Sequence, residues 1–378
     1  MTYVAFRMLI GDRAKYIGLL FAVAFSTFLL QNQSSIFSNL MKRAGNQVRD
    51  VTDADIWVMA PRTDYFDQTK PLKETDLLKV RGVNGVDYAV RIFKSLPIAN
   101  TRDGHFSACT VLGLDDASLV GAPRHMILGD WRDLWKPESV IIDKAGYLLL
   151  FPGEELQLGR ELELNDKRVR IVGISDALPA FTTFPIIHAR YSEALTFQGR
   201  QRQQLSFVLA RPRPGVDAGE LASRITHETG LKALTSARFQ WASVTYYLRN
   251  TGIPVNFGIT VVVSIIVGLV VTGQTFYLFI LENLKQFGAL KAIGVTNRTM
   301  LGMVLFQSLL VWFVGVGFGT AISATFFNIS PFVIQLRHFI FFWESAVGVA
   351  AFMLLVIAIA SSAGLIRVIR LQPAEVFR

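Results

Sequence analysis

The chain has 378 residues, of which 51% are hydrophobic and only 18% charged, and its mean hydropathy is +0.39. A chain this apolar is not an ordinary soluble protein, so part of it must lie in lipid. Its 38 basic residues exceed its 29 acidic residues by nine. The region 40–252 is nevertheless almost balanced, with 28 basic and 25 acidic residues, which argues against a nucleic-acid-binding surface. The single cysteine, Cys109, cannot form an internal disulfide, and the histidines lack metal-ligand spacing, so we expect no metal site.

Four apolar stretches are long enough to span a membrane, and we predict transmembrane helices at 16–39, 253–281, 299–330 and 345–366. The first is the least apolar. Its basic flank also suits a signal peptide, but no small-residue cleavage site follows it, so an uncleaved helix is predicted. The second lies in the uncharged stretch 252–281, whose 30 residues as a helix of about 45 Å exceed the ~30 Å hydrocarbon core, so it must tilt or project. Pro331 is predicted to end the third.

The region 40–252 has the pattern of a mixed α/β domain between the first two spans. Runs rich in β-branched and aromatic residues predict strands near 55–59, 108–114, 168–174 and 205–209. Apolar residues at three-to-four spacing predict helices at 73–80 and 217–229. The two ends, 40–50 and 238–250, fit either helical stalks or plain connecting loops.

Basic residues in the short loops predict which side of the membrane each segment occupies. Segments 1–15, 282–298 and 367–378 carry nine basic residues (Arg7, Arg13, Lys15, Lys285, Lys291, Arg298, Arg367, Arg370 and Arg378) and three acidic ones (Asp12, Glu282 and Glu375). The loop 331–344 carries only Arg337, His338 and Glu344. Both termini are therefore expected in the cytoplasm, with 40–252 outside.

We find no sequence motif for catalysis or nucleotide binding. The chain contains no His-Glu-x-x-His, Gly-x-Ser-x-Gly, Cys-x-x-Cys or phosphate-binding loop. The acidic pairs Asp115-Asp116 and Glu154-Glu155 are best read as solvated turn residues rather than general acids or bases. We therefore expect no catalytic residue, no cofactor and no ATP hydrolysis on this chain.

Small and polar residues within the spans predict helix packing. Gly315 and Gly319 have the small-x-x-x-small spacing that lets helix backbones approach closely, either within one chain or across a dimer. Gln274 and Gln307 lie inside apolar spans, where an unsatisfied amide is costly. Each is expected to bond a neighbouring helix or to face water, with helix packing the preferred reading.

The segment 282–298 predicts a short amphipathic helix between two spans. Leu284, Phe287 and Leu290 recur every third residue, Gly294 suits a left-handed C-terminal cap, and Thr296 or Asn297 can cap the next helix. One interpretation places its apolar face in lipid. The other is a docking element whose apolar face fits a groove on a cytoplasmic partner.

This segment resembles the coupling helix of the MacB/FtsX-like, four-helix permeases of ABC transporters. The matching features are Glu282, Phe287-Gly288 and Lys291-Ala292-Ile293-Gly294, although the position after Glu282, usually basic, is Asn283. The C-terminal run Arg370-Leu-Gln-Pro373-Ala-Glu375-Val-Phe-Arg378 is similar to the family's second motif, with Phe377 in place of leucine. Residues 54–59 resemble a motif of the DevC-like branch, and residues 5–9 a cytoplasmic amphipathic lead-in helix.

The resemblance implies a fold of four transmembrane helices and a porter-like α/β domain in a bacterial inner membrane. It implies a partner-binding surface on the coupling helix, made of Glu282, Leu284, Phe287, Gly288, Leu290, Lys291, Ala292 and Gly294. The partner would be a cytoplasmic ATPase that holds ATP and Mg²⁺, and other partners would be a second copy of the chain, membrane lipid and a periplasmic membrane-fusion adaptor. The implied function is export or extraction of a lipid, peptide, haem or drug. The alternative is mechanical activation of an extracytoplasmic partner such as a cell-wall hydrolase.

Overall fold

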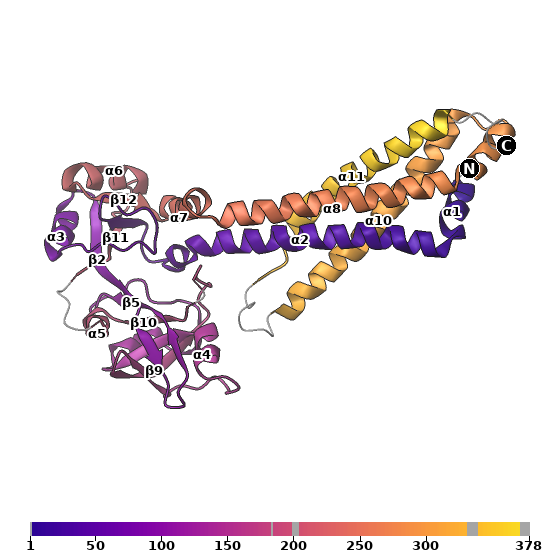
Figure 1. Ribbon diagram of the computed structural model, residues 1–378. Coiled ribbons are helices and arrows are strands. Elements are labelled where there is room, and N and C mark those ends of the chain that lie inside the picture. Colours follow the sequence, from indigo (N-terminus) through magenta and orange to yellow (C-terminus); the bar gives the residue numbers. More distant parts are fainter. Residues whose placement is uncertain (1, 183, 199–203, 331–338, 371–378) are drawn as a thin grey trace. The chain divides into compact units, whose positions relative to one another are not determined.

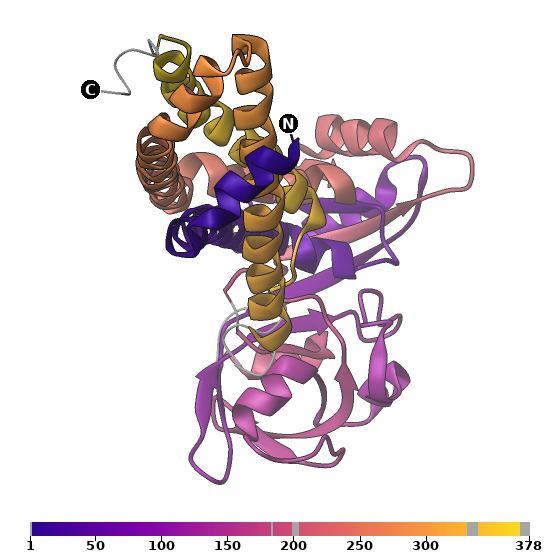
Figure 2. The same ribbon diagram turned by 90° about the vertical axis from the view of Figure 1, so that its right-hand side faces the viewer.

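The computed structural model describes residues 2–182, 184–198, 204–330 and 339–370. The chain forms two compact units. The helical unit comprises Met1–Asn39 and Gly252–Arg378, and the α/β domain comprises Leu40–Thr251. Figures 1 and 2 show the elements of both units along the chain.

In its described residues the helical unit contains the helices α1 Thr2–Gly11, α2 Arg13–Asp50, α8 Ile253–Glu282, α9 Leu284–Ala292, α10 Asn297–Ile329 and α11 Trp343–Arg370. Among the described residues, four helices (α2, α8, α10 and α11) are long and apolar enough to cross a membrane. The helix α2 continues without a break to Asp50, so residues 40–50 form a helical stalk rather than a loop. The helix α10 ends at Ile329, and Pro331, the predicted breaker, lies outside the described residues.

Two predicted packing glycines of α10 lie against α2 of the same chain. A Cβ atom added to Gly315 would be 2.7 Å from the Cβ of Val23, and one added to Gly319 would be 2.5 Å from the Ala24 carbonyl oxygen. Any larger side chain would force the two helices apart. Both glycines therefore pack closely within the chain, against α2.

Polar residues of α2 are also bonded inside the helical unit. The Gln31 amide donates to the Ser345 hydroxyl at 2.7 Å, and the Asn39 amide donates to the Ile340 carbonyl at 2.8 Å. The Trp312 indole of α10 donates to the Ala350 carbonyl at 2.9 Å. Such bonds are needed because an unpaired polar group in lipid costs several kcal/mol.

The α/β domain is organised around one mixed sheet. Its strand order is β12-β1-β11-β2-β5-β10-β7-β9-β8-β3-β4, and β6 pairs with β9. The pairs β5–β10 and β7–β9 are parallel, and the remaining pairs are antiparallel. The strands are β1 Ile56–Met59, β2 Val86–Ser95, β3 Ile98–Asn100, β4 Phe106–Ala108, β5 Thr110–Leu114, β6 Met126–Gly129, β7 Ser139–Asp143, β8 Glu161–Leu164, β9 Lys167–Ser175, β10 Ile186–Arg190, β11 Phe207–Pro212 and β12 Lys232–Thr235.

Short helices cover this sheet, namely α3 Glu74–Gly82, η1 Trp131–Trp135, α4 Lys144–Leu150, α5 Tyr191–Thr196, α6 Ala218–Thr229 and α7 Ser236–Asn250. The four predicted strand regions and the helices predicted at 73–80 and 217–229 are confirmed, with the run 108–114 divided between β4 and β5. The second stalk segment is the helix α7.

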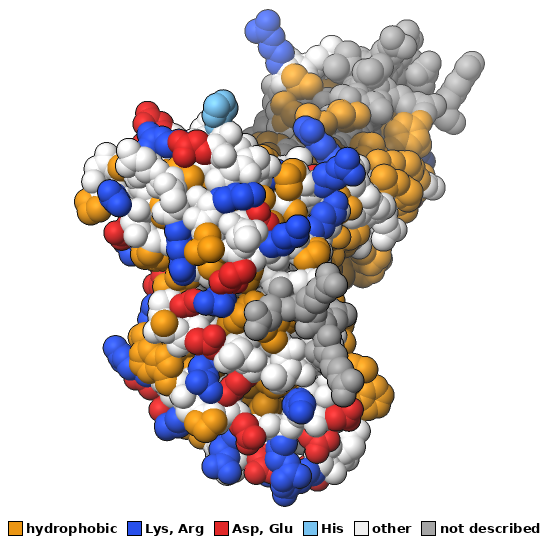
Figure 3. Space-filling view, turned by 90° about the vertical axis from the view of Figure 1, so that its left-hand side faces the viewer, with side chains coloured by type: hydrophobic (Ala, Val, Ile, Leu, Met, Phe, Trp, Pro, Cys, Tyr) orange, Lys and Arg blue, Asp and Glu red, His pale blue; other side chains and the backbone are white. Residues whose placement is uncertain are grey.

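The domain has two hydrophobic clusters formed by alternate residues of its strands. Ile56 and Val58 of β1 belong to one cluster and Trp57 to the other, as the two-residue period of a strand requires. Charged side chains of both signs are interspersed on the face of this domain seen in Figure 3, consistent with its near-balanced composition.

Candidate functional site

The candidate site is the end of the helical unit where α1 and the α8–α9 junction lie together (Figure 1). The helix α8 ends at Glu282, and the chain turns at Asn283 before α9 begins. The buried Asn283 amide donates to the Phe279 carbonyl at 2.7 Å, which holds this turn. A side-chain bond of this kind satisfies a carbonyl that the helix end leaves without a partner.

The far end of α9 is closed by the predicted cap. Gly294 has a φ of +99°, a left-handed conformation that glycine adopts without steric cost, and the Val295 amide bonds to the Leu290 carbonyl at 3.1 Å. The Thr296 hydroxyl then accepts from the Thr299 amide at 3.4 Å and caps α10. Both cap predictions are confirmed, with Thr296 rather than Asn297 in the second role.

The apolar face of α9 packs inside the chain. Phe287 is 0% exposed, belongs to the same hydrophobic cluster as Leu9 of α1 and Met300 of α10, and is followed by the buried Gly288. Leu284 and Leu290 are half-buried. Phe287 and Gly288 are therefore covered by the chain's own helices, and contact of the remaining predicted residues with a partner stays a prediction. Contact with the chain's own helices removes the same apolar surface from water that a partner groove or lipid would.

The opposite face of α9 is available to a partner. Lys285, Gln286, Ala289 and Ala292 are exposed, Ile293 is 81% exposed just after the helix, and Lys291 is half-buried. Ile293 is one of many large apolar side chains that this chain exposes, so the face is defined by its position beside α8 and α10 and not by this residue alone. We define the docking face as Lys285, Gln286, Ala289, Ala292 and Ile293.

An ion pair joins the ends of two spans beside this face. The Lys15 ammonium of α2 lies 2.7 Å from a Glu282 carboxylate oxygen and 2.8 Å from Asp12. The Lys15 and Glu282 side chains are 42% and 48% exposed, so water screens the pair and it adds little to stability. The resemblance places Glu282 on the partner-binding surface, and the base that it meets here belongs to its own chain.

An open groove of about 500 Å³ lies between α1 and the α8–α9 junction. Its wall carries both signs of charge, with Arg7 and Lys15 facing it alongside Glu282. The helix α1 is held in place because the buried Gln307 amide of α10 donates to the Ala5 carbonyl at 2.8 Å. Gln307 thus bonds a neighbouring helix, as predicted for a polar residue in a span.

Two groups of predicted site residues are not brought into this site. Gln274 is exposed on α8 instead of being packed against another helix of the chain. Arg370 is the last residue of α11, and Pro373, Glu375 and Arg378 of the C-terminal motif lie outside the described residues. Sequence reasoning also missed Lys15 as the partner of Glu282, because a basic flank before a span is ordinarily explained by membrane orientation alone.

Two family models match the chain and together cover most of it. Residues 17–228 match the MacB-like periplasmic core domain, and residues 258–373 match the FtsX-like permease C-terminal model. An uncharacterized ABC transporter permease of Mycobacterium tuberculosis is 24% identical over 275 residues, covering 69% of each chain. Another from Mycobacterium bovis is 26% identical over 224 residues, covering 58% of each chain.

Among solved structures, the chain is similar to the periplasmic region of MacB from Actinobacillus actinomycetemcomitans, with 14% identity and a TM-score of 0.39 over 54% of this chain and 96% of that one. It is also similar to the extracellular domain of YknZ from Gram-positive bacteria, with 16% identity and a TM-score of 0.35 over 48% of this chain and 98% of that one. The matched family models carry the assignment. The chain is a membrane protein that belongs to the MacB/FtsX-like family of ABC transporter permeases.

Proposed function

We propose that this permease couples ATP hydrolysis on a separate cytoplasmic ATPase to movement of its own α/β domain on the outer side of a bacterial inner membrane. In this scheme the ATPase holds ATP and Mg²⁺ and binds the docking face and the groove beside α1. Two copies of the chain form the membrane unit, and both termini are cytoplasmic. The nine-to-three excess of basic residues in the short segments supports this orientation.

The observation that carries the proposal is the two-sided burial of α9. One side is anchored among the chain's own helices through Phe287, while the other presents Ala289 and Ile293 to solvent. A helix held in this way moves together with α8 and α10 when a partner pushes on it. An interfacial helix in lipid would instead direct its phenylalanine away from the chain.

Export or extraction of a lipid, peptide, haem or drug is the function that we favour, with a periplasmic adaptor as a further partner. A specific observation also supports mechanical activation of an outer partner without transport. The helix α2 runs unbroken over 38 residues, a rod of roughly 57 Å, from the Lys15–Glu282 pair to Asp50. A continuous helix can transmit a displacement along its axis, and this does not require a pathway for a transported substrate.

The test is to replace Ile293 with Asp on the docking face. A charge in an apolar contact loses a few kcal/mol, so ATPase retention on co-purification should fall about a hundredfold. Leu96→Asp is the matched control, because it makes the same aliphatic-to-acid change at a 57% exposed site in the α/β domain. It should retain the ATPase.

Phe287→Asp is not a docking test, because a buried charge there would disrupt the helical unit itself. The Ile293 variant must therefore be shown to insert normally into membranes. If it inserts and still holds the ATPase with full stimulated turnover, α9 does not dock the partner through this face.

A further inference from the structure

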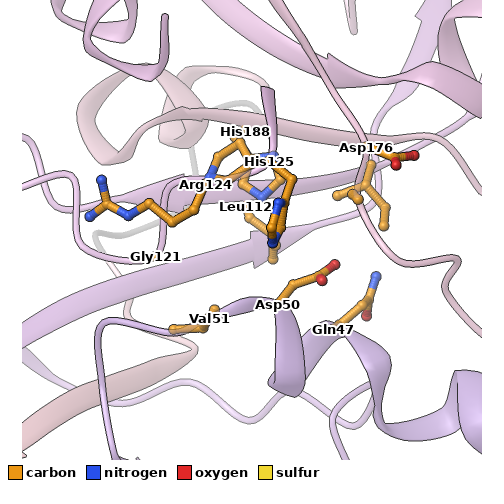
Figure 4. Close-up of a pocket in the computed structure, with 12 residues that line it drawn as sticks. Gln47, Asp50, Val51, Leu112, Gly121, Arg124, His125, Asp176 and His188 are labelled. Atoms are coloured by element: carbon orange, nitrogen blue, oxygen red, sulfur yellow. The ribbon is translucent and has the colours of Figure 1, made fainter. Parts of the chain in front are cut away.

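The α/β domain contains a small cavity at the end of the stalk part of α2, shown in Figure 4. It measures about 20 Å³, enough for one group of the size of water or ammonium. Gln47 and Asp50 line it from α2, and His188 lines it from β10. Figure 4 shows the Asp50 and Gln47 side chains rising from the helix toward the histidine side of the cavity.

Two nearly buried polar groups at this cavity lack a partner within the described part of the chain. His188 is 4% exposed and Gln47 is 5% exposed, and neither His188 Nδ1 nor Gln47 Nε2 makes a hydrogen bond. Leaving a buried polar atom unpaired costs about 1–3 kcal/mol, so such atoms point to a missing ligand. Burial lowers the pKa of His188 to about 4, which keeps the ring neutral and leaves one of its nitrogens as an acceptor.

Asp50 is an acid that lines this cavity. One of its oxygens accepts the Leu178 amide at 2.9 Å, and burial, with smaller contributions from the carboxylates of Asp176 and Asp143, raises its pKa to about 7. Near neutral pH Asp50 is therefore only partly ionised, and an entering cation would favour its charged form. The partial negative charge of the α2 C-terminus likewise favours a bound cation.

The basic residue lining the cavity does not neutralise it. Arg124 is committed to Asp53, with its Nε atom 3.2 and 3.1 Å from the two carboxylate oxygens. In Figure 4 its guanidinium points away from Asp50. The lining therefore holds an acid that Arg124 does not pair, the unpaired His188 Nδ1 and the Gln47 amide, with His125 as a second basic residue.

We propose that this cavity binds a primary ammonium group, with the Asp50 carboxylate supplying the counter-charge and His188 Nδ1 accepting one N–H. The unpaired Gln47 Nε2 is a donor, so the amide must rotate about its terminal bond before its oxygen can accept from the ammonium. A divalent metal fits less well, because no group of three or more His, Cys, Asp or Glu side chains suited to a metal exists among the described residues. This inference is independent of the docking proposal, since every residue that it uses lies in the α/β domain.

The experiment titrates the full chain in detergent micelles, labelled with ¹⁵N-histidine, with methylamine at constant ionic strength. The His188 ring nitrogens should shift and saturate. Tetramethylammonium has the charge but no N–H and is too large, so it should produce no saturable shift. A second titration uses Nα-acetyl-lysine amide and tests whether the cavity accepts the ammonium group of a lysine side chain. Saturation by either amine supports the site.

Asp50→Asn keeps an oxygen for the Leu178 amide but removes the charge, and it should weaken methylamine binding about tenfold or more. Gln47→Leu should weaken it about threefold, since a neutral hydrogen bond contributes less. Asp87→Asn, an exposed acid that does not line the cavity, is the matched control and should bind as the unchanged chain does. If neither amine shifts His188, or tetramethylammonium acts equally, or Asp50→Asn binds unchanged, the cavity holds only water and the proposal is wrong.

Discussion

His188 is a buried ring whose protonation couples pH to the stability of the α/β domain. Its pKa falls from 6.5 to about 4 because burial penalises the charged form. Between these values the unfolded chain binds a proton that the folded chain does not, so the contribution of His188 to stability is fully present above about pH 6.5 and is lost as the pH falls toward 4. The loss is on the order of 3 kcal/mol. The acids Asp50 and Asp143, whose pKa values burial raises to about 7 and about 6, contribute in the opposite sense, so the effect of His188 is measured as a difference between variants.

His188→Leu should remove this dependence, because leucine carries no proton in either state. Thermal unfolding of the full chain is followed by tryptophan fluorescence, to which the buried Trp57 of this domain contributes, at about pH 7 and pH 4.5. From about pH 7 to about pH 4.5, the melting temperature of the variant should fall less than that of the unchanged chain. Replacement of the exposed His105 by Leu should leave the pH dependence as it was. Equal losses in all three proteins would show that His188 is not the linked group.

At the scale of elements, two glycines on one helix provide a matched pair for testing close packing. The Gly319 position touches the backbone of α2, whereas nothing lies within 4 Å of a Cβ added to Gly317. Gly319→Leu should force α10 away from α2 and destabilise the helical unit by about 1–3 kcal/mol. Gly317→Leu should be tolerated. Melting of the two variants in the same detergent measures the difference, and similar melting temperatures would argue against a packing role for Gly319.

Local features of the candidate site could be predicted from the sequence, but the surroundings of Phe287 could not. Gly294 and Thr296 act through local backbone geometry, so their roles as caps are visible in the sequence. The period of Leu284, Phe287 and Leu290 predicts a helix with one apolar face but carries no information on what covers it. Lipid, a partner and the chain's own helices bury apolar area equally well.

The cavity at Asp50 and His188 was invisible in the sequence for a different reason. Its residues come from the end of α2 and from β10, and they meet only because β10 pairs with β5 and β7 across the sheet. Local patterns predict the strands themselves, since alternation and β-branched residues are sufficient for that. The pairing order is set by long-range packing, so no short window contains it.

At the scale of the whole molecule, α8 is the span that the rest of the chain covers least. Only 17% of its apolar window is buried, compared with 44% for α2, 39% for α10 and 33% for α11. Gln274 lies exposed on this helix, within an otherwise apolar segment. An amide facing hydrocarbon without a partner is costly, and polar residues within a span pair with neighbours where they can. A second copy of the chain, placed with α8 against α8, would supply that neighbour.

We therefore expect Gln274 to lie at the contact between two copies of the permease. Cys109 is the only cysteine of the chain, so a Cys109→Ala background leaves a single introduced thiol to report proximity. Gln274→Cys in this background should form a disulfide-linked dimer in membranes under mild oxidation, because matching positions on two facing helices bring the sulfur atoms within bonding range. Ile322→Cys, at a 52% exposed site on α10, is the control and should remain monomeric when the thiols are oxidised.

A second variant, Gln274→Leu, should lower the dimer fraction measured by single-molecule photobleaching, by a few-fold for an interhelical bond of about 0.6–2 kcal/mol. Cross-linking at Ile322 but not at Gln274 would place the contact on α10, and an unchanged dimer fraction in Gln274→Leu would mean that the exposed amide contributes nothing to assembly.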